Sequence, residues 1–223
     1  VGTHTITVTC TDDGTGTLSA SDQYVLTVTN VNDAPTTSGG SATVAEDATH
    51  TFTTTASDWG YTDVDSNDAL VTVDITTLPG TGTLNYGGNA VSAGDDIAVG
   101  NLGGLTYAPV ANANGAVTFT FKVNDGDAWS ASAGTFTLTY TAVNDAPTVA
   151  SAISDASTAE DAAYSLNVAG TCTDVDGDTL TYSISGAPST ITISGTTISG
   201  TPVNANVGTH TITVTCTDDG TGT

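Results

Sequence analysis

The feature that most constrains this chain is an exact internal repeat. The seventeen residues VGTHTITVTCTDDGTGT at positions 1–17 recur without change at 207–223, which sets a period of 206 residues. Identity at a fixed period is the signature of a tandem array. We therefore expect these 223 residues to be one repeat unit plus a short overlap, taken from a longer array in which a copy of Leu18 follows Thr223.

A second, looser repeat divides the unit into two domains. The hexapeptide VNDAPT occurs at 31–36 and again at 143–148. These two segments are the predicted linkers, and they bound a complete domain A at residues 33–145. The second domain, B, takes residues 146–223. Both lengths suit a β-sandwich of about seven strands.

The repeat predicts that both ends of the chain belong to domain B. Residues 1–32 are expected to be the C-terminal two strands of a preceding B copy, and residues 146–223 to be a B domain that lacks its last strand. A copy of residues 18–32 would complete it. One alternative is a head-to-tail polymer, in which residues 1–32 of one subunit complete domain B of its neighbour. We favour a continuous chain, because 1–17 and 207–223 would compete for the same strand position in the polymer.

Strict alternation of apolar and polar residues predicts strands that are buried on one face. The alternating segments are HTITVTC (4–10 and 210–216), YVLTVT (24–29), VTFTFKV (117–123), FTLTYT (136–141) and LTYSIS (180–185). Glycine, asparagine and proline clusters separate these segments as turns. The sequence therefore predicts an all-β chain of tandem sandwich domains.

The charge balance is extreme, because 24 acidic residues face a single basic residue, Lys122. Nucleic acid is excluded as a partner, since binding to phosphates requires lysine and arginine. Such a chain repels itself unless cations lie among the carboxylates, which favours divalent metal. No segment approaches the roughly 18 apolar residues of a membrane span, and neither end resembles a signal peptide, so we expect targeting information to lie outside this sequence.

The three cysteines are consistent with one disulfide in each B domain. Cys10 and Cys216 are the same position in successive copies, and Cys172 is the predicted partner position. We therefore predict a Cys172–Cys216 bond, while Cys10 would pair with the equivalent of Cys172 upstream. An oxidising, extracellular setting follows, so the protein is expected to be secreted or on a cell surface. Two free buried thiols are the alternative.

Carboxylates gather in four groups that recur in the same order in both domains. The groups are an Ala-Glu-Asp segment (Glu46, Asp47; Glu160, Asp161), an Asp-x-Asp loop (Asp63, Asp65; Asp174, Asp176, Asp178), an acidic turn (Asn124, Asp125, Asp127; Asp218, Asp219) and a linker Asn-Asp (Asn32, Asp33; Asn144, Asp145). In a sandwich these loops would converge at one end, beside the linker. Ca²⁺ suits such a group, since it takes 6 to 8 oxygen ligands in flexible geometry. Ordinary polar turns are the alternative.

These motifs resemble those of cadherins. VNDAP resembles the linker of cadherin domains, TDVDGD (173–178) resembles their Asp-x-Asp loop, and VTCTDDG (214–220) resembles their acidic turn. Domain B looks like the dystroglycan-type cadherin-like domains of bacterial surface proteins, with SGTP at 199–202. Domain A is similar to the cadherin-like repeats of giant bacterial adhesins, with LTYAPVANANG at 105–115.

The resemblance implies two calcium sites, one at each junction. At the A-to-B junction the implied ligands are Glu46, the carbonyl of Asn144, Asp145, Asp174, Asp176 and Asp218. At the B-to-A junction they are Asn32, Asp33, Asp63, Asp65, Asp125 and a Glu160 from the preceding B copy. The Leu-Asp-Arg-Glu segment of cadherins is missing, so we expect one or two ions at each junction.

The function implied is that of a structural or adhesive repeat in a long, extracellular, calcium-rigidified fibre or bacterial surface adhesin. Its expected partners are neighbouring copies of itself, with cell-surface glycans as an open second partner. The alternative is an array of carbohydrate-binding modules with Trp59 and Trp129 as sugar platforms. An enzyme is not expected, because His4, His50 and His210 have no nucleophile motif nearby.

Overall fold

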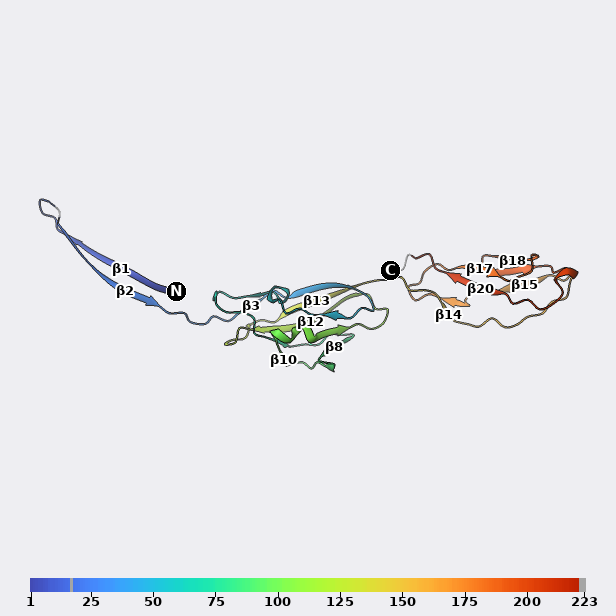
Figure 1. The fold of residues 1–223 in the computed structure, drawn as a ribbon, viewed down its shortest axis with the longest axis horizontal. Coiled ribbons are helices and arrows are strands. Elements are labelled where there is room, and N and C mark those ends of the chain that lie inside the picture. Colours follow the sequence, from blue (N-terminus) through green and yellow to red (C-terminus); the bar gives the residue numbers. More distant parts are fainter. Residues whose placement is uncertain (17, 221–223) are drawn as a thin grey trace. The chain divides into compact units, whose positions relative to one another are not determined.

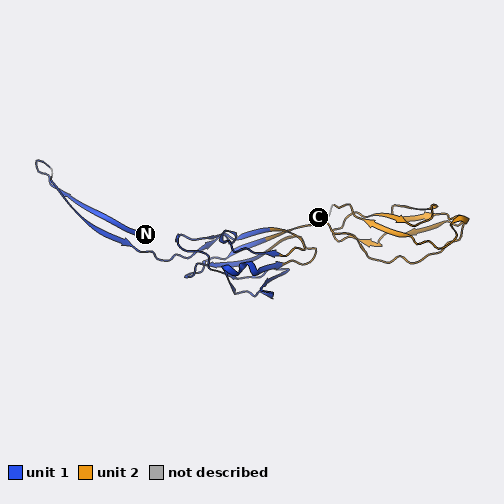
Figure 2. Cartoon of the chain, viewed as in Figure 1, with its two compact units in different colours: residues 1–42, 50–107, 118–137 blue, residues 43–49, 108–117, 138–223 orange. Residues whose placement is uncertain are grey.

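The computed structural model describes residues 1–16 and 18–220 (Figure 1). Contacts between Cα atoms group the chain into two compact units (Figure 2): unit 1 comprises residues 1–42, 50–107 and 118–137, and unit 2 comprises residues 43–49, 108–117 and 138–223. Strands dominate the described residues, with three short 3-10 helices, η1 (Ala56–Trp59), η2 (Val99–Gly104) and η3 (Asn204–Asn206). The all-β prediction is confirmed.

The first element is a hairpin of β1 (Gly2–Thr11) and β2 (Ser19–Val28) (Figure 1). The two strands pair antiparallel over ten residues, from Gly2 opposite Val28 to Thr11 opposite Ser19. Every residue of β2 is exposed. A two-stranded hairpin is marginal in water without a core to pack on.

Eleven strands follow between residues 36 and 141. They are β3 (Thr36–Thr37), β4 (Gly40–Ala45), β5 (His50–Thr51), β6 (Tyr61–Thr62), β7 (Thr72–Ile75), β8 (Thr83–Tyr86), β9 (Asn89–Ala90), β10 (Asp95–Ala98), β11 (Leu105–Ala108), β12 (Gly115–Asn124) and β13 (Gly134–Thr141). The two larger sheets have the orders β10-β7-β12-β13-β4 and β5-β11-β8-β9, and β3 pairs with β6. Paired sheets of this kind form a sandwich.

The core of unit 1 is aromatic. In β12 the inward positions Phe119 and Phe121 are buried while the residues between them are not, as the period of a strand requires. Phe52 and Phe136 pack on these rings and on each other, with ring centroids 5.0 to 6.5 Å apart. Trp59 completes the cluster, is fully buried, and donates its indole N–H to the carbonyl of Thr53 at 3.1 Å.

Gly60 ends η1 in the left-handed region, with φ at 59°. A Cβ at this position would overlap the carbonyl oxygen of Gly39. Gly60→Ala is therefore expected to destabilise the fold by at least about 2 kcal/mol. This is the energy cost of a left-handed backbone conformation for alanine plus that of the steric overlap. Gly87→Ala is the matched control, since Gly87 has φ at 57° with nothing near the added carbon, and it should cost about 1 kcal/mol. Urea denaturation measures both, and equal costs would contradict the overlap.

Seven short strands form between residues 148 and 217 of unit 2. They are β14 (Thr148–Val149), β15 (Tyr164–Asn167), β16 (Cys172–Thr173), β17 (Thr181–Ser185), β18 (Ile191–Ser194), β19 (Thr197–Gly200) and β20 (Thr213–Thr217). Their sheets are β15-β19-β18, β17-β20 and β14-β16. The core here is small: three buried apolar residues, Val168, Ile191 and Ile198, with partly buried neighbours around them.

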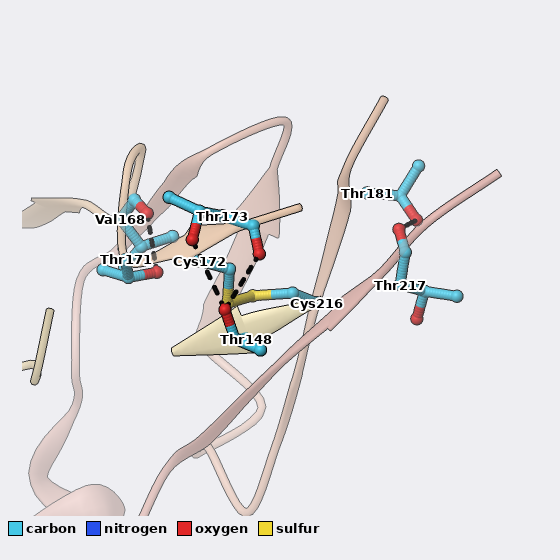
Figure 3. The surroundings of a disulfide bond; sticks show 8 residues. All are labelled: Thr148, Val168, Thr171, Cys172, Thr173, Thr181, Cys216 and Thr217. Carbon is cyan, nitrogen blue, oxygen red and sulfur yellow. Dashed lines mark hydrogen bonds between the residues drawn. A yellow bond between two sulfur atoms is a disulfide. The ribbon is translucent and has the colours of Figure 1, made fainter. Parts of the chain in front are cut away.

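A disulfide joins Cys172 in β16 to Cys216 in β20, as the repeat predicts (Figure 3). Beside it, the Thr148 hydroxyl lies 3.4 Å from the Thr173 carbonyl that accepts its hydrogen bond. Cys10 is exposed and forms no disulfide within the described part of the chain. Its pairing with an upstream cysteine stays a prediction.

Identical sequences behave differently at the two ends of the chain. The segment HTITVTC is strand throughout at residues 4–10, but at 210–216 only Thr213 onward is strand. The prediction of a strand over 210–216 is therefore wrong for its first three residues. In the first copy β2 pairs along the whole segment, whereas in the second the partner β17 ends at Ser185, opposite Thr213. The length of this strand is set by its partner.

Candidate metal centre

In unit 1, three carboxylates of the loop after β6 form the Asp63 cluster, defined as Asp63, Asp65 and Asp68. One oxygen from each lies within 4.8 Å of the others. The loop is folded by its own side chains, because the backbone N–H of Asp65 donates to Asp63 Oδ1 at 2.8 Å. The linker contacts the same loop, since the N–H of Asp33 donates to Asp65 Oδ2 at 2.7 Å.

The acidic turn after β12 is tied to the same linker. The side-chain amide of Asn32 donates to Asp125 Oδ2 at 3.2 Å. Burial would raise the pKa of Asp125, but hydrogen bonds from the N–H groups of Ala128 and Asp127 and from Asn32 outweigh it, so the pKa is lowered. Asp125 is thus held in its charged form.

Two groups in or beside the Asp63 cluster have raised pKa values. Burial and the carboxylates of Asp65 and Asp63 raise the pKa of Asp68. Burial and Asp63, whose carboxylate accepts the Tyr61 hydroxyl at 3.3 Å, raise the pKa of Tyr61 to about 12. Both shifts have the direction expected where negative charge is concentrated without a counter-charge.

In unit 2, five carboxylates form the Glu46 cluster, defined as Glu46, Asp145, Asp174, Asp176 and Asp178. Asp176 belongs to two triads with oxygens within 4.8 Å, one with Glu46 and Asp145 and one with Asp174 and Asp178. Glu46 Oε1 accepts the N–H of Val143 at 2.7 Å. Burial and the carboxylate of Asp176 raise the pKa of Asp145.

Three oxygens of the Glu46 cluster are buried without a hydrogen-bond partner: Glu46 Oε2, Asp145 Oδ2 and Asp174 Oδ2. Glu46 is itself only 5% exposed. Buried carboxylate oxygens without a donor carry a large desolvation cost, which a cation can offset. Carboxylate oxygens are the ligands that Ca²⁺ prefers, in numbers a group of five acids can supply, so the donor set fits this ion.

The two clusters are connected to their linkers in the same way. Asp145 N–H donates to Asp176 Oδ2 at 2.7 Å, as Asp33 does to Asp65. The N–H of Asp176 donates to Asp174 Oδ1 at 2.9 Å, matching the contact of Asp65 with Asp63. Asn144 reaches Asp218 Oδ1 at 3.4 Å, as Asn32 reaches its acidic turn. The same constellation is thus built twice.

The single basic side chain of the sequence serves neither cluster. Lys122 in β12 lies opposite Asp74 in β7, and Asp74 lies opposite Asp96 in β10. Burial and Asp96 raise the pKa of Asp74, while Lys122 opposes the rise. The one lysine of the sequence therefore interacts with Asp74 and not with either cluster.

The clusters bring together Asp63 with Asp65 and Glu46 with Asp145, Asp174 and Asp176, whereas the predicted ligands Asp33, Asp125, Glu160 and Asp218 lie outside them. Glu160 is exposed in unit 2, whereas Asp33 and Asp65 belong to unit 1, so its supply by a preceding copy stays a prediction. Asp218 contacts Asn144 but lies outside both triads of the Glu46 cluster. Two cluster members, Asp68 and Asp178, were missing from the predicted ligand sets. Their signal was the further acid three or two residues beyond each Asp-x-Asp pair.

The use of Trp59 as a sugar platform is wrong, because its ring is fully buried among Phe52, Phe121 and Phe136. A platform needs an exposed ring face. Trp129 is 38% exposed and pairs through its backbone with Asn124.

Two domain families account for most of the sequence. Residues 31–141 match the family of cadherin-like domains, and residues 146–223 match the family of putative Ig domains. The chain therefore belongs to the proteins built from cadherin-like and Ig-like repeat domains. Cadherin-like domains are adhesion-type, extracellular domains that usually bind Ca²⁺. No curated protein matches the chain at a significant level.

A solved cadherin structure shows the same fold. A protocadherin gammaB7 EC3-6 cis-dimer matches with a TM-score of 0.56 and 18% identity, over 96% of this chain and 54% of that chain. N-cadherin EC1-4 from Drosophila matches with a TM-score of 0.38 and 13% identity, over 99% of this chain and 56% of that chain. An endo-fucoidan hydrolase of glycoside hydrolase family 107 matches with a TM-score of 0.31 and 22% identity, over 97% of this chain and 32% of that chain. The first likeness shows the fold, and no conclusion rests on the other two.

The chain spans about half the length of the cadherin chains that it matches. None of the helices in the described ranges is long and apolar enough to cross a membrane.

Proposed function

We propose that this chain is a structural or adhesive segment of an extracellular fibre or surface adhesin whose domain junctions are stiffened by Ca²⁺. The observation that carries the proposal is the set of three buried oxygens without partners, on Glu46, Asp145 and Asp174. Their burial in a chain with one lysine leaves a divalent cation as the counter-charge.

The proposed ligands lie on both sides of a linker and within it. Glu46 comes before the linker, Asp145 is part of it, and Asp174 and Asp176 follow in the next loop. A cation held by all four would hold these segments together, so that the linker could no longer bend freely. The role of Ca²⁺ here is to neutralise and to cross-link, and we assign no catalytic role to either cluster.

The Asp63 cluster supports the same function at the other linker. The contact of Asp33 with Asp65 repeats that of Asp145 with Asp176. Asn32 likewise contacts the acidic turn of its domain as Asn144 does. A fibre of alternating domains needs a stiffening site at every junction, and this repetition supplies one. The exact 17-residue repeat and the Cys172–Cys216 disulfide support a tandem, extracellular array.

Calcium is expected to protect the linker between β13 and β14, residues 142–147, from proteolysis. Sites of this type in extracellular proteins bind with dissociation constants of about 10⁻⁴ to 10⁻³ M. At 10 mM Ca²⁺ a site that binds only the folded chain would contribute about 1.4–2.7 kcal/mol. Limited proteolysis in 10 mM CaCl₂ and in excess chelator, with cleavage sites read by mass spectrometry, measures the effect.

Magnesium is the control, because its tighter octahedral geometry suits this donor set poorly. Protection by Ca²⁺ but not by equal Mg²⁺ is the expected result. Cleavage of residues 142–147 at the same rate in calcium and in chelator would contradict the proposed stiffening.

A further inference from the structure

The turn that follows β4 places Glu46 in its cluster. Strand β4 ends at Ala45, and the N–H of Glu46 still donates to the carbonyl of Thr141 in β13 at 2.9 Å. The chain then reverses, because the N–H of Ala48 donates to the carbonyl of Ala45 at 3.3 Å. Asp47 is the third residue of this turn and has φ at 62°, in the left-handed region. Glu46 is therefore the last residue held against β13 before the chain turns away.

Domain B contains the same turn. The N–H of Ala162 donates to the carbonyl of Ala159 at 3.4 Å, and Asp161 has φ at 57°. Glycine or asparagine is the usual residue at a left-handed turn position, because most residues with a Cβ have a higher conformational energy there. Both domains nevertheless have aspartate at this position.

The Asp47 side chain fastens its turn to the loop between β11 and β12, residues 109–114. Its Oδ1 accepts the backbone N–H of Asn112 at 2.8 Å. Asn112 is itself left-handed, with φ at 56°, and the N–H of Ala113 donates to the carbonyl of Val110 at 3.2 Å, so the loop is tightly folded at the contact. Glycine at position 47 could keep the turn but would lose this hydrogen bond.

The corresponding turn and loop also meet in domain B. The loop Pro-Val-Asn-Ala-Asn at 202–206 is similar in sequence to Pro-Val-Ala-Asn-Ala-Asn at 109–114, and its fold has the equivalent bond, from the N–H of Asn206 to the carbonyl of Val203 at 2.7 Å. The N–H of Asp161 donates to the carbonyl of Pro202 at 2.8 Å. An Ala-Glu-Asp-Ala turn fastened to a Pro-Val loop is thus part of both domains.

The position of Glu46 matters because its two carboxylate oxygens have different surroundings. Oε1 accepts the N–H of Val143, whereas Oε2 is buried without a partner. One oxygen of Glu46 lies within 4.8 Å of carboxylate oxygens of Asp145 and Asp176. Because the Glu46 side chain is buried in close packing, its oxygens can move only if the backbone of the turn moves.

We propose that Asp47 is a positioning residue for the Glu46 cluster: its left-handed backbone turns the chain directly after Glu46, and its carboxylate holds that turn against the loop 109–114. Asp47 is not a proposed ligand, because it lies outside both triads of the cluster. The inference rests on the proposed function, since it concerns how tightly the Glu46 cluster binds Ca²⁺. Loss of an outer contact of this kind lowers metal affinity by about tenfold or more.

Two neutral variants of the 223-residue chain test the role of Asp47 at equal charge. Asp47→Asn retains an acceptor oxygen and tolerates the left-handed region, whereas Asp47→Ala loses both properties. Isothermal titration calorimetry measures binding at the site that Asp174→Asn removes. There Asp47→Asn should bind Ca²⁺ within about threefold of the parent chain, because Asp47 is exposed and its charge is screened. Asp47→Ala should bind at least about tenfold more weakly than Asp47→Asn.

A third variant covers the case in which Asp47→Ala fails to fold. Asp47→Gly fits the left-handed backbone without strain, so it should fold and should still bind Ca²⁺ more weakly than Asp47→Asn. Asp161→Ala is the matched control, because it makes the same change in the turn of domain B, whose glutamate does not belong to the Glu46 cluster. It should leave binding at this site unchanged.

Hydrogen exchange of the calcium-free chain tests the contact itself. The amide of Asn112 donates to the Asp47 side chain, so it should exchange at least about tenfold faster in Asp47→Ala and Asp47→Gly than in Asp47→Asn. Equal exchange in the three variants would show that the side chain does not hold the loop, and would overturn the proposal.

The binding results separate this proposal from the proposed function. If the parent chain binds Ca²⁺ and the three Asp47 variants bind it equally well, the role of Asp47 is overturned and the calcium site stands. A loss in Asp47→Asn as large as that in Asp47→Ala would trace the effect to the charge of Asp47 and would also overturn its positioning role. A parent chain that binds no Ca²⁺ would overturn both proposals.

Discussion

Replacement of Trp59 by alanine is expected to destabilise its domain by about 3–5 kcal/mol, the cost of removing a large buried aromatic side chain from a packed core. The ring is fully buried and packs on Phe52, Phe121 and Phe136, with centroids 4.9 to 5.6 Å away. Its indole N–H also satisfies the carbonyl of Thr53. The substitution would leave a cavity and remove this hydrogen bond.

Scanning calorimetry measures this effect as a drop of more than about 10 °C in the melting transition of that domain. Trp129→Ala is the control, because Trp129 is 38% exposed and outside the aromatic cluster, and it should cost about 1 kcal/mol or less. Similar losses for the two variants would contradict the structural role given to Trp59.

The second large effect is expected from loss of the Cys172–Cys216 disulfide. The double substitution to serine should destabilise the domain of β14–β20 by about 4 kcal/mol, the chain-entropy value for a closed loop of roughly 45 residues. Because that domain has only three buried apolar residues in its core, we expect the variant domain to melt well below the rest of the chain.

Cys10→Ser is the matched control, since Cys10 has the same sequence neighbours as Cys216 but is exposed and outside any disulfide of the described residues. It should change the unfolding free energy by no more than about 0.5 kcal/mol. Equal destabilisation by Cys10→Ser and by the double variant would show that the bond itself contributes nothing.

Many residues of the clusters could be predicted because the same acidic motifs occur in both domains. Asp33 with Asp65 and Asp145 with Asp176 occupy matching places in two domains, so an accidental cluster of acids was already improbable from the sequence. Asp68 was missed because the bend that returns it to Asp65 depends on a backbone hydrogen bond, from the N–H of Asp68 to the carbonyl of Asp65. Spacing alone does not reveal that bend.

The features that sequence could not predict depend on tertiary partners. Trp59 lies in a 3-10 helix between strands, where no period of burial exists to mark it as a core residue. The shortening of β20 relative to β1 cannot be predicted from two identical sequences, because it follows from where the pairing partner β17 ends. The local alternation of apolar and polar residues predicts where a strand can form. The strand that pairs with it determines how many of those residues become strand.

Calcium binding by the Glu46 cluster is tested most directly by isothermal titration calorimetry. The chain should bind Ca²⁺ with a dissociation constant of about 10⁻⁴ to 10⁻³ M, and Asp174→Asn should lose the heat of one site, because it removes a charge and one of the buried oxygens without a partner. Asp155→Asn, an exposed acid outside both clusters, should bind as the parent chain does. No measurable heat, or equal binding by Asp174→Asn and the parent chain, would contradict the site.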